Sequence, residues 1–205
     1  MLDRIHEYLE EITPDRPPVL AELEAYAAEH GFPIIGPLVG RFLYQLALTM
    51  GARRVLELGS GFGYSAYWFS LAMGAAGEIV MTDTDEANRE RALEMFARAG
   101  LESRFDFRLG EALQTAAGLA GPFDVILNDI DKEDYPRTID EAARLLRPGG
   151  VFVTDNVIWD GKVLKTERDD ATEAIVRFTR QLYSDRRFFT TVLPLRDGIS
   201  VAVRV

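Results

Sequence analysis

A glycine-rich turn after a short apolar run is the first stretch of this sequence that points to chemistry. Residues 55–58 (Val-Leu-Glu-Leu) have the pattern of a strand buried in a parallel sheet. Gly59, Gly61 and Gly63 follow, and glycines at such a turn let a ligand lie against the backbone. The helical pattern that begins at Tyr64 directs free N–H groups at the same place. This stretch therefore predicts a nucleotide-type pocket at the carboxyl end of a strand.

Two acids are candidates for ligand contacts near this turn, one just before it and one at the end of the next expected strand. Glu57 lies inside the first strand, where a carboxylate suits a cationic or polyhydroxylated ligand better than a phosphate; the alternative is an acid that caps a neighbouring backbone group. Asp83 ends the next expected strand, roughly twenty residues past the turn, where an acid accepts hydrogen bonds from ribose hydroxyls. The dinucleotide fingerprint needs a glycine where this chain has Tyr64, which disfavours an NAD-dependent dehydrogenase.

A second set of polar residues follows two later strands. Asp129 and Asp131 come directly after residues 123–128, and Asp155 and Asn156 come directly after residues 151–154. Both strand ends should open into the crevice of the glycine turn, so Asp129, Asp155 and Asn156 can converge. Two carboxylates and one amide oxygen suit Mg²⁺, Mn²⁺ or Ca²⁺. The alternative for either acid alone is a helix cap or a turn former.

Lys132 lies three residues after Asp129, in a chain with three lysines and twenty arginines. A neutral lysine beside a metal site can act as a general base, whereas an arginine stays protonated. The alternative is a solvated surface lysine.

Composition limits the class of protein. The 205 residues predict a single domain, 1–205, and 47% hydrophobic content is ordinary for a globular protein. A net charge of -10 disfavours binding of nucleic acid through a broad basic surface, although a small acceptor site on RNA stays open. Without cysteine, and with His6 and His30 as the two histidines, any metal should be a hard cation held by oxygen. No apolar run is long enough for a membrane span and the start is not a signal peptide, so we expect a cytoplasmic enzyme.

The rest of the chain supplies the elements that would position these residues. Residues 1–50 form a helical lead, and the loop at residues 32–37, which contains Ile35, is expected to touch the ligand. Strands and helices then alternate over residues 51–205, which predicts an α/β fold with a mostly parallel sheet and helices on both faces. The turn Arg196-Asp197-Gly198 lies between two β-branched runs and predicts a C-terminal antiparallel hairpin. The expected strands are 55–58, 78–82, 105–109, 125–128, 151–154, 188–193 and 199–205, and the expected helices are 2–12, 19–28, 38–50, 64–73, 86–99, 111–117, 135–146 and 171–183.

Three motifs together resemble the cation-dependent O-methyltransferases, a family of class I S-adenosylmethionine-dependent enzymes that includes the catechol and caffeoyl-coenzyme A enzymes. The motifs are Glu57-Leu58-Gly59 to Tyr64-Ser65, Asp129-Ile130-Asp131-Lys132, and Asp155-Asn156-Val157-Ile158-Trp159-Asp160-Gly161. The resemblance runs from about residue 35 to residue 205. It implies a Rossmann-like methyltransferase sheet, S-adenosyl-L-methionine as cofactor, a divalent cation, most simply Mg²⁺, and a homodimer.

The resemblance also implies a role for each matched residue. Lys132 would be catalytic, and the metal ligands would be Asp129, Asp155 and Asn156. Cofactor contacts would come from Ile35, Glu57, Gly59, Ser60, Gly61, Ser65, Asp83, Glu111, Ala112, Asp129 and Asp131. Asn128 departs from the family, which usually has an apolar residue there, and the short N-terminal segment disfavours a coenzyme A ester as substrate.

The implied reaction is direct methyl transfer to a hydroxyl of a small vicinal-diol, catechol-like acceptor. The metal would chelate two neighbouring acceptor oxygens, and Lys132 would take the proton of the hydroxyl to be methylated. Residues 157–170 would form much of the acceptor wall, where Trp159 either stacks on an aromatic ring or simply packs. Three other readings stay open: a tRNA wobble-uridine O-methyltransferase of the same family, an NAD-dependent dehydrogenase, and a protein that binds S-adenosylmethionine without catalysis.

Overall fold

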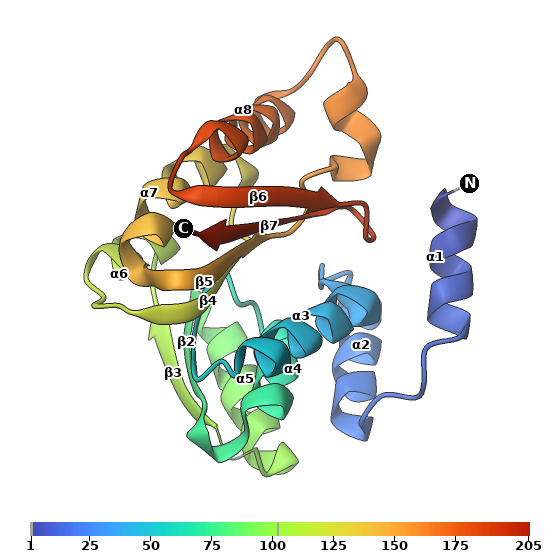
Figure 1. Ribbon diagram of the computed structural model, residues 1–205. Helices are drawn as coiled ribbons and strands as arrows, with labels where there is room; N and C mark the ends of the chain where they lie inside the picture. Colours follow the sequence, from blue (N-terminus) through green and yellow to red (C-terminus); the bar gives the residue numbers. More distant parts are fainter. Residues whose placement is uncertain (1, 102) are drawn as a thin grey trace.

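A seven-stranded sheet forms the centre of the computed structural model, which describes residues 2–101 and 103–205 (Figure 1). The strand order is β3-β2-β1-β4-β5-β7-β6. The five strands from β3 to β5 are parallel, and β7 is antiparallel to both β5 and β6. The expected mostly parallel sheet with a C-terminal antiparallel hairpin is confirmed. The bounds are β1 Arg54–Leu58, β2 Glu78–Asp83, β3 Arg104–Leu109, β4 Phe123–Asn128, β5 Leu146–Thr154, β6 Phe188–Leu193 and β7 Ile199–Arg204.

Helices cover both faces of the sheet, as expected (Figure 1). On one face α2, α3, α4 and α5 build a core around Val39, Leu43, Phe69 and Phe96. On the other face α6, α7 and α8 build a second core around Tyr135, Ile139 and Phe178. The bounds are α1 Leu2–Glu11, α2 Pro18–His30, α3 Gly36–Met50, α4 Tyr64–Met73, α5 Glu86–Ala99, α6 Ala112–Ala117, α7 Tyr135–Leu145 and α8 Asp170–Ser184. Short 3₁₀ helices lie at η1 Gly74–Ala76, η2 Lys132–Asp134 and η3 Trp159–Leu164.

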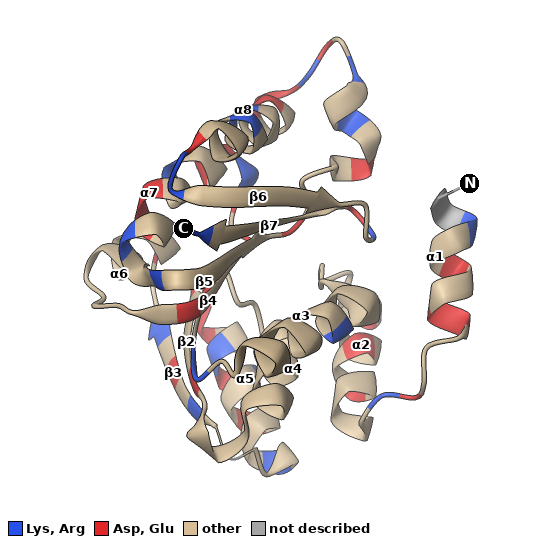
Figure 2. Cartoon of the chain, viewed as in Figure 1, with Lys and Arg blue, Asp and Glu red and all other residues tan. Residues whose placement is uncertain are grey.

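Burial explains the sequence pattern of the central strands. All residues of β1 after Arg54 are buried, and β4 is buried except at Asp124. Strands that are covered on both faces need continuous apolar runs, which is how these two read in the sequence. The edge strands β3 and β6 are mostly half-buried or exposed. Figure 2 shows the same division in the helices: α3 and α4 carry few charged residues, whereas α1, α7 and α8 carry many.

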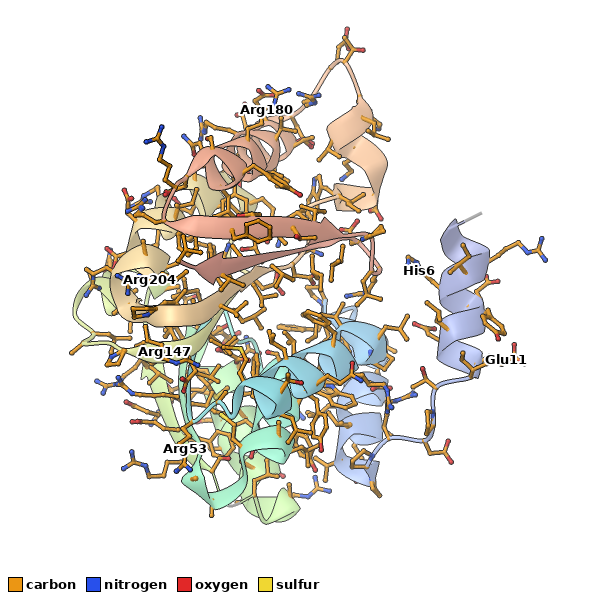
Figure 3. The ribbon with its side chains drawn as sticks, in the orientation of Figure 1. His6, Glu11, Arg53, Arg147, Arg180 and Arg204 are labelled. Atoms are coloured by element: carbon orange, nitrogen blue, oxygen red, sulfur yellow. The ribbon has the colours of Figure 1, made fainter. Side chains whose placement is uncertain are left out.

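The first helix stands apart from the body of the protein (Figure 1). An extended segment joins α1 to α2, whose first residue is Pro18. Proline is favoured at the first helical position because a backbone N–H there would have no partner within the helix, so its absence costs nothing. The His6 side chain points from α1 toward the tip of the β6–β7 hairpin (Figure 3). Among the described residues, no helix has the length and apolar character needed to cross a membrane.

The largest error in the expected boundaries is at the start of β5, and the other bounds differ from the structure by at most two residues. The strand predicted at residues 151–154 begins five residues earlier, at Leu146, and α7 ends at Leu145 rather than at residue 146. The pair Pro148-Gly149 reads as a break in the sequence, but Leu146 pairs with Phe123 of β4 through a shifted register. An ion pair between Arg147 Nε and Asp124 Oδ1, 2.6 Å apart, holds this irregular start of the strand in place.

Candidate active site

A cavity of about 400 Å³ opens at the carboxyl ends of β1, β2, β4 and β5. Nearly all of the residues predicted for the site line it. The lining includes Ile35, Gly59, Ser60, Gly61, Ser65, Asp83, Glu111, Ala112, Asp129, Asp131, Lys132, Asp155 and Asn156. Glu57 is the exception: it is fully buried and is not among the lining residues. The parallel sheet therefore brings together residues from four separate strand ends.

The glycine turn fits closely against the loop after β4. Gly59 has a φ of 80°, and a Cβ at this position would lie 2.5 Å from the backbone oxygen of Asp129. The Asp129 N–H donates to the Leu58 oxygen over 2.8 Å, which joins the same two segments from the other side. A glycine at position 59 is thus required both by the backbone angle and by the approach of Asp129.

Asp83 connects the end of β2 to the glycine turn. Its Oδ2 accepts the Gly61 N–H at 3.0 Å, and its Oδ1 accepts from Asp85 N at 2.8 Å and from Asn88 Nδ2 at 3.1 Å. A carboxylate has about four lone-pair sites, so Asp83 can still accept a hydrogen bond from a ligand in the cavity. Its side chain therefore shapes the turn as well as lining the cavity.

Glu57 is fully buried on β1. Neither carboxylate oxygen has a hydrogen-bond partner among the described residues. Burial raises the pKa of Glu57 to about 7; the hydroxyls of Ser65 and Ser60 lower it in part, although neither reaches hydrogen-bonding geometry, and the charge of Asp129 raises it further. Near neutral pH this carboxyl group is therefore close to its midpoint of ionisation.

Asp129 and Asp155, which we call the paired acids, face each other from the ends of β4 and β5. Asp155 is almost completely buried, and its Oδ1 has no partner among the described residues. Burial and then the charge of Asp129 raise the pKa of Asp155 to about 7, against smaller opposing contributions that include the charges of Arg196 and Lys132. Lys132 Nζ donates to Asp129 Oδ1 at 2.9 Å. Asp155 thus presents a buried carboxylate oxygen that lacks a counter-charge of its own.

Asn156 follows Asp155 with a φ of 58°, an angle that asparagine tolerates better than most residues. Its Nδ2 donates to Asp197 Oδ2 at 3.3 Å, so the amide oxygen is not engaged by this contact. The Tyr135 hydroxyl donates to the Asp155 backbone oxygen at 2.9 Å and fixes the same segment from below. The backbone and Asp197 together set the direction of the Asn156 amide.

The paired acids and Asn156 supply the oxygen ligands that a hard cation prefers. Among the described side chains, those of residues 4–101 and 103–205, no three or more His, Cys, Asp or Glu form a cluster placed to hold a metal ion. The predicted ligand set has only two carboxylates, Asp129 and Asp155, and its third ligand is the amide oxygen of Asn156, so it does not count as such a cluster. The buried, unpartnered oxygen of Asp155 and the oriented amide of Asn156 fit such a ligand set.

Trp159 forms the wall beside Lys132. Its ring centroid lies 5.5 Å from Lys132 Nζ and 4.7 Å from Lys162 Nζ, and Lys132 also lies 5.0 Å from the Tyr135 ring. Trp159 has a φ of 52°, and its buried Nε1 has no partner among the described residues. The ring lines the cavity, so it can contact a ligand, while its lysine contacts fix its position.

A model of the O-methyltransferase family matches residues 10–205. The chain belongs to the O-methyltransferase family. It is similar to the catechol O-methyltransferase of Niastella koreensis, with 36% identity over 188 residues that cover 86% of this chain and 85% of the relative. It is also 36% identical, over 171 residues, to the catechol O-methyltransferase domain-containing protein 1 of Mus musculus; the match covers 80% of this chain but only 65% of that protein, less than two thirds of its length.

Solved structures agree with this membership. The O-methyltransferase from Bacillus cereus, solved in complex with SAH, superposes with a TM-score of 0.88 at 29% sequence identity, and the match covers 100% of both chains. Family membership confirms the predicted resemblance and makes the chain an O-methyltransferase. The dehydrogenase reading is therefore set aside.

Some cavity residues were not found from the sequence. Arg196 lies at the cavity wall and Asp197 orients Asn156, although both were noted only as part of a hairpin turn. Phe32 and Pro33 also line the cavity, within the loop that was expected to touch a ligand. The turn stands about forty residues after Asn156, and no local pattern in the sequence brings the two together. The positive φ of Arg196 is visible only in the structure.

Proposed function

We propose that the chain transfers a methyl group from S-adenosylmethionine to one hydroxyl of a small aromatic acceptor that carries two adjacent hydroxyls. The observation that carries this proposal is the meeting of the glycine turn, the paired acids and Lys132 in one cavity. A catechol O-methyltransferase among the relatives and the SAH bound to the Bacillus cereus enzyme support it. The proposal includes a cytoplasmic location.

The cofactor half of the cavity is the part around the glycine turn. Gly59 and Gly61 keep this wall free of side chains, so an elongated ligand can lie against the backbone. Asp83 retains acceptor capacity for ribose hydroxyls after its three hydrogen bonds within the chain. Glu111 and Ala112, at the start of α6, extend the wall on the adenosine side.

The acceptor half is the part around the paired acids and Trp159. We propose that Asp129, Asp155 and Asn156 hold a divalent cation, most simply Mg²⁺, with Mn²⁺ or Ca²⁺ as alternatives. Such a cation would hold two adjacent hydroxyl oxygens and favour the ionised form of one of them. The unpartnered oxygen of Asp155 and the amide direction of Asn156 support this ligand set.

Lys132 is the group that takes the proton. Its Nζ lies 2.9 Å from Asp129 Oδ1 and within 5.5 Å of the Trp159 ring centroid, between the acids and the acceptor wall. A charged lysine has no lone pair, so this proton transfer requires Lys132 as the neutral amine, released from its ion pair with Asp129. The acceptor O–H bond breaks with its proton moving to Nζ, the oxygen bonds to the methyl carbon, and the sulfur keeps the electron pair of the broken S–C bond. Positioning in the cavity supplies much of the acceleration.

The test is methyl transfer with the purified chain, S-adenosylmethionine and catechol, in Mg²⁺ and again in excess chelator. S-adenosylhomocysteine and the monomethyl ether of catechol are expected in equal amounts with Mg²⁺ and at background with chelator. Calorimetric binding of S-adenosylhomocysteine is measured in parallel. Cofactor binding without product from catechol or any related diol would contradict the proposed acceptor and support a protein that binds the cofactor without catalysis.

We also propose that the chain forms a homodimer. The first helix exposes three large apolar side chains on one side: Ile5 at 46%, Tyr8 at 57% and Ile12, just after α1, at 55%. A helix that projects from the body with an uncovered apolar side is suited to packing against another copy. Light scattering should give twice the mass of one chain, and charged replacements at Ile5 and Tyr8 should return it to the mass of a monomer.

A further inference from the structure

Arg196 stands at the wall of the active-site cavity, and nothing in the proposed reaction uses it. We propose that Arg196 selects diol acceptors whose ring carries a carboxylate, and that it binds this group through the Nε–Nη2 edge of the guanidinium. The inference rests on the function proposed above and names the class of acceptor for the same site. Four observations support it: backbone conformation, side-chain anchoring, lack of an acidic partner and the available hydrogen-bond donors.

The backbone at Arg196 is unusual for an arginine. Gly198 N donates to the Leu195 oxygen at 2.9 Å, which makes residues 195–198 a tight turn with Arg196 as its second residue. Arg196 has a φ of 51°. Glycine, asparagine and aspartate are favoured at a position of this kind, and a long side chain there costs backbone energy. Strained positions cluster at functional sites, so a reason for arginine should be found in what its side chain does.

The side chain is held across the mouth of the cavity. Its Nη1 donates to the backbone oxygen of Ile34, in the loop before α3, and the Arg196 N–H donates to His6 Nε2 at 3.0 Å. Figure 3 shows His6 reaching toward the hairpin tip from α1. A Cβ at Gly36 would lie 3.5 Å from Arg196 Nε, so the glycine at position 36 leaves room beside this edge. The guanidinium is therefore positioned before any acceptor binds.

Arg196 has no acidic partner among the described residues. Among the side chains that the structure describes, those of residues 4–101 and 103–205, no carboxylate oxygen lies within 4.0 Å of the Arg196 guanidinium, whereas Lys132 Nζ, also in the cavity wall, lies 2.9 Å from Asp129 Oδ1. Arg196 is nevertheless close enough to Asp155 for its charge to lower the pKa of that carboxyl group in part. The unpaired cation thus lies on the acceptor side of the cavity, near the paired acids.

The free donors of Arg196 match a carboxylate. Nη1 is bonded to Ile34, but no described residue accepts from Nε or Nη2, which together offer two parallel N–H groups. Two parallel donors on a guanidinium suit the two oxygens of a carboxylate. The cavity wall also carries several acids, which repel an anionic acceptor unless a cation meets its charged group. An acceptor with its diol at the paired acids and its carboxylate at Arg196 satisfies both requirements.

The experiment compares two acceptors, 3,4-dihydroxybenzoate and catechol, with the unaltered chain and with Arg196→Gly and Arg196→Met. The glycine variant relieves the backbone at this position, and the methionine variant keeps much of the length of the side chain without its charge. Arg180→Met is the matched control, since it removes one positive charge from an exposed arginine on α8, outside the cavity lining. The readouts are kcat/KM for each acceptor, the ratio of the two possible monomethyl ethers of 3,4-dihydroxybenzoate, and their dependence on ionic strength.

In the Arg196 variants we expect kcat/KM for 3,4-dihydroxybenzoate to fall by about ten- to a hundredfold, mostly through KM, as for loss of a charged hydrogen-bonded pair. The loss with catechol should be much smaller than the loss with 3,4-dihydroxybenzoate, and the product ratio should move toward an even mixture because the ring is no longer anchored. Arg180→Met should behave as the unaltered chain.

Two results would overturn the inference alone. If activity with both acceptors falls equally, Arg196 serves only to hold the loop at Ile34 in place. If activity with neither acceptor falls, Arg196 has no role in acceptor binding. Failure of the unaltered chain to methylate either acceptor is a different result: it would overturn the proposed function, and this inference with it.

Discussion

Asn156 Nδ2 donates to Asp197 Oδ2 at 3.3 Å, and this contact joins the end of β5 to the hairpin between β6 and β7. The Asp197 carboxylate also accepts a hydrogen bond from the Asp160 N–H. The backbone oxygen of Asp197 accepts a hydrogen bond from the Ile158 N–H at 2.9 Å. One aspartate in the hairpin thus organises both the proposed metal ligand and the start of the acceptor wall. Groups that orient metal ligands in this way affect metal affinity although they do not touch the metal.

Replacement of Asp197 by alanine should therefore weaken metal binding. We expect the affinity for Mn²⁺, measured by electron paramagnetic resonance, to fall by about ten- to a hundredfold. Binding of S-adenosylhomocysteine, whose contacts are proposed for the opposite half of the cavity, should stay the same. Asp197→Asn keeps an oxygen that can accept from Asn156 and should recover part of the affinity. Unchanged Mn²⁺ affinity in Asp197→Ala, with Asp155→Asn also unaffected, would exclude this ligand set.

Replacement of Lys132 by arginine separates charge from proton transfer. Arginine keeps a cation near Asp129 but does not give up its proton near neutral pH. We expect kcat to fall by about a hundredfold or more in both Lys132→Arg and Lys132→Met, as for loss of a general base. Calorimetry should give an unchanged Kd for S-adenosylhomocysteine in both. Near-normal turnover in Lys132→Arg would show that a positive charge, rather than a base, is what the site needs at this position.

Glu57 predicts a pH dependence of stability. Its pKa is 4.5 for an exposed glutamate and about 7 in the fold, so the folded chain binds more protons than the unfolded chain between these values. The free energy of unfolding should therefore fall as pH rises from about 4.5 to 7, by roughly 3 kcal/mol from this residue. Asp155 contributes with the same sign, because its pKa is also raised.

The variant Glu57→Gln isolates the contribution of Glu57. Urea unfolding of both chains at several pH values, without cofactor or metal, should give a smaller decrease between pH 5 and pH 8 for the variant than for the unaltered chain. A constant difference between the two curves across this range would contradict a raised pKa at Glu57. The constant part of the difference reports the cost of a buried amide instead of a buried carboxyl group.

Gly59→Ala tests the close approach of the glycine turn to Asp129. Gly51→Ala is the matched control, since Gly51 also has a positive φ, 58°, but a Cβ there meets nothing within 4 Å. The control should lose about 1 kcal/mol of unfolding free energy from the backbone alone. Gly59→Ala should lose roughly 1–3 kcal/mol more, because its Cβ would meet the Asp129 backbone at 2.5 Å. Equal losses in thermal or urea unfolding would mean that the two segments move apart easily.

Much of the fold could be predicted because its signals are local. The helices at residues 64–73 and 86–99 and the strand at 188–193 have the bounds that their periodicity and glycine or turn signals indicate. The start of β5 could not be predicted in this way, because its pairing with Phe123 overrides the Pro-Gly break. Periodicity describes neighbours along the chain, whereas register depends on a strand elsewhere in the sequence.

The predictions for the cavity likewise succeeded or failed according to whether the contacts could be read from the local sequence. Asp129 and Asp155 could be placed together because parallel strands end at one edge of the sheet. Glu57 stays a predicted cofactor contact: it is fully buried next to the glycine turn, and it is not among the residues that line the cavity. Arg196 escaped prediction since its place depends on a hairpin whose tip meets α1 and the loop before α3, segments about 160 residues or more away in the sequence.

The position of β7 has a consequence for how the protein is made. β7 follows β6 along the chain, yet it lies between β5 and β6 in the sheet. While the ribosome is still adding residues 199–204, β6 has no strand beside it and the hairpin tip with Arg196 and Asp197 has no fixed place. The hairpin side of the cavity is therefore completed only when β7 has been added, after the glycine turn and all five parallel strands have emerged. Proteolytic removal of β7 would leave the hairpin tip without its second strand and the edge of β5 open to other chains.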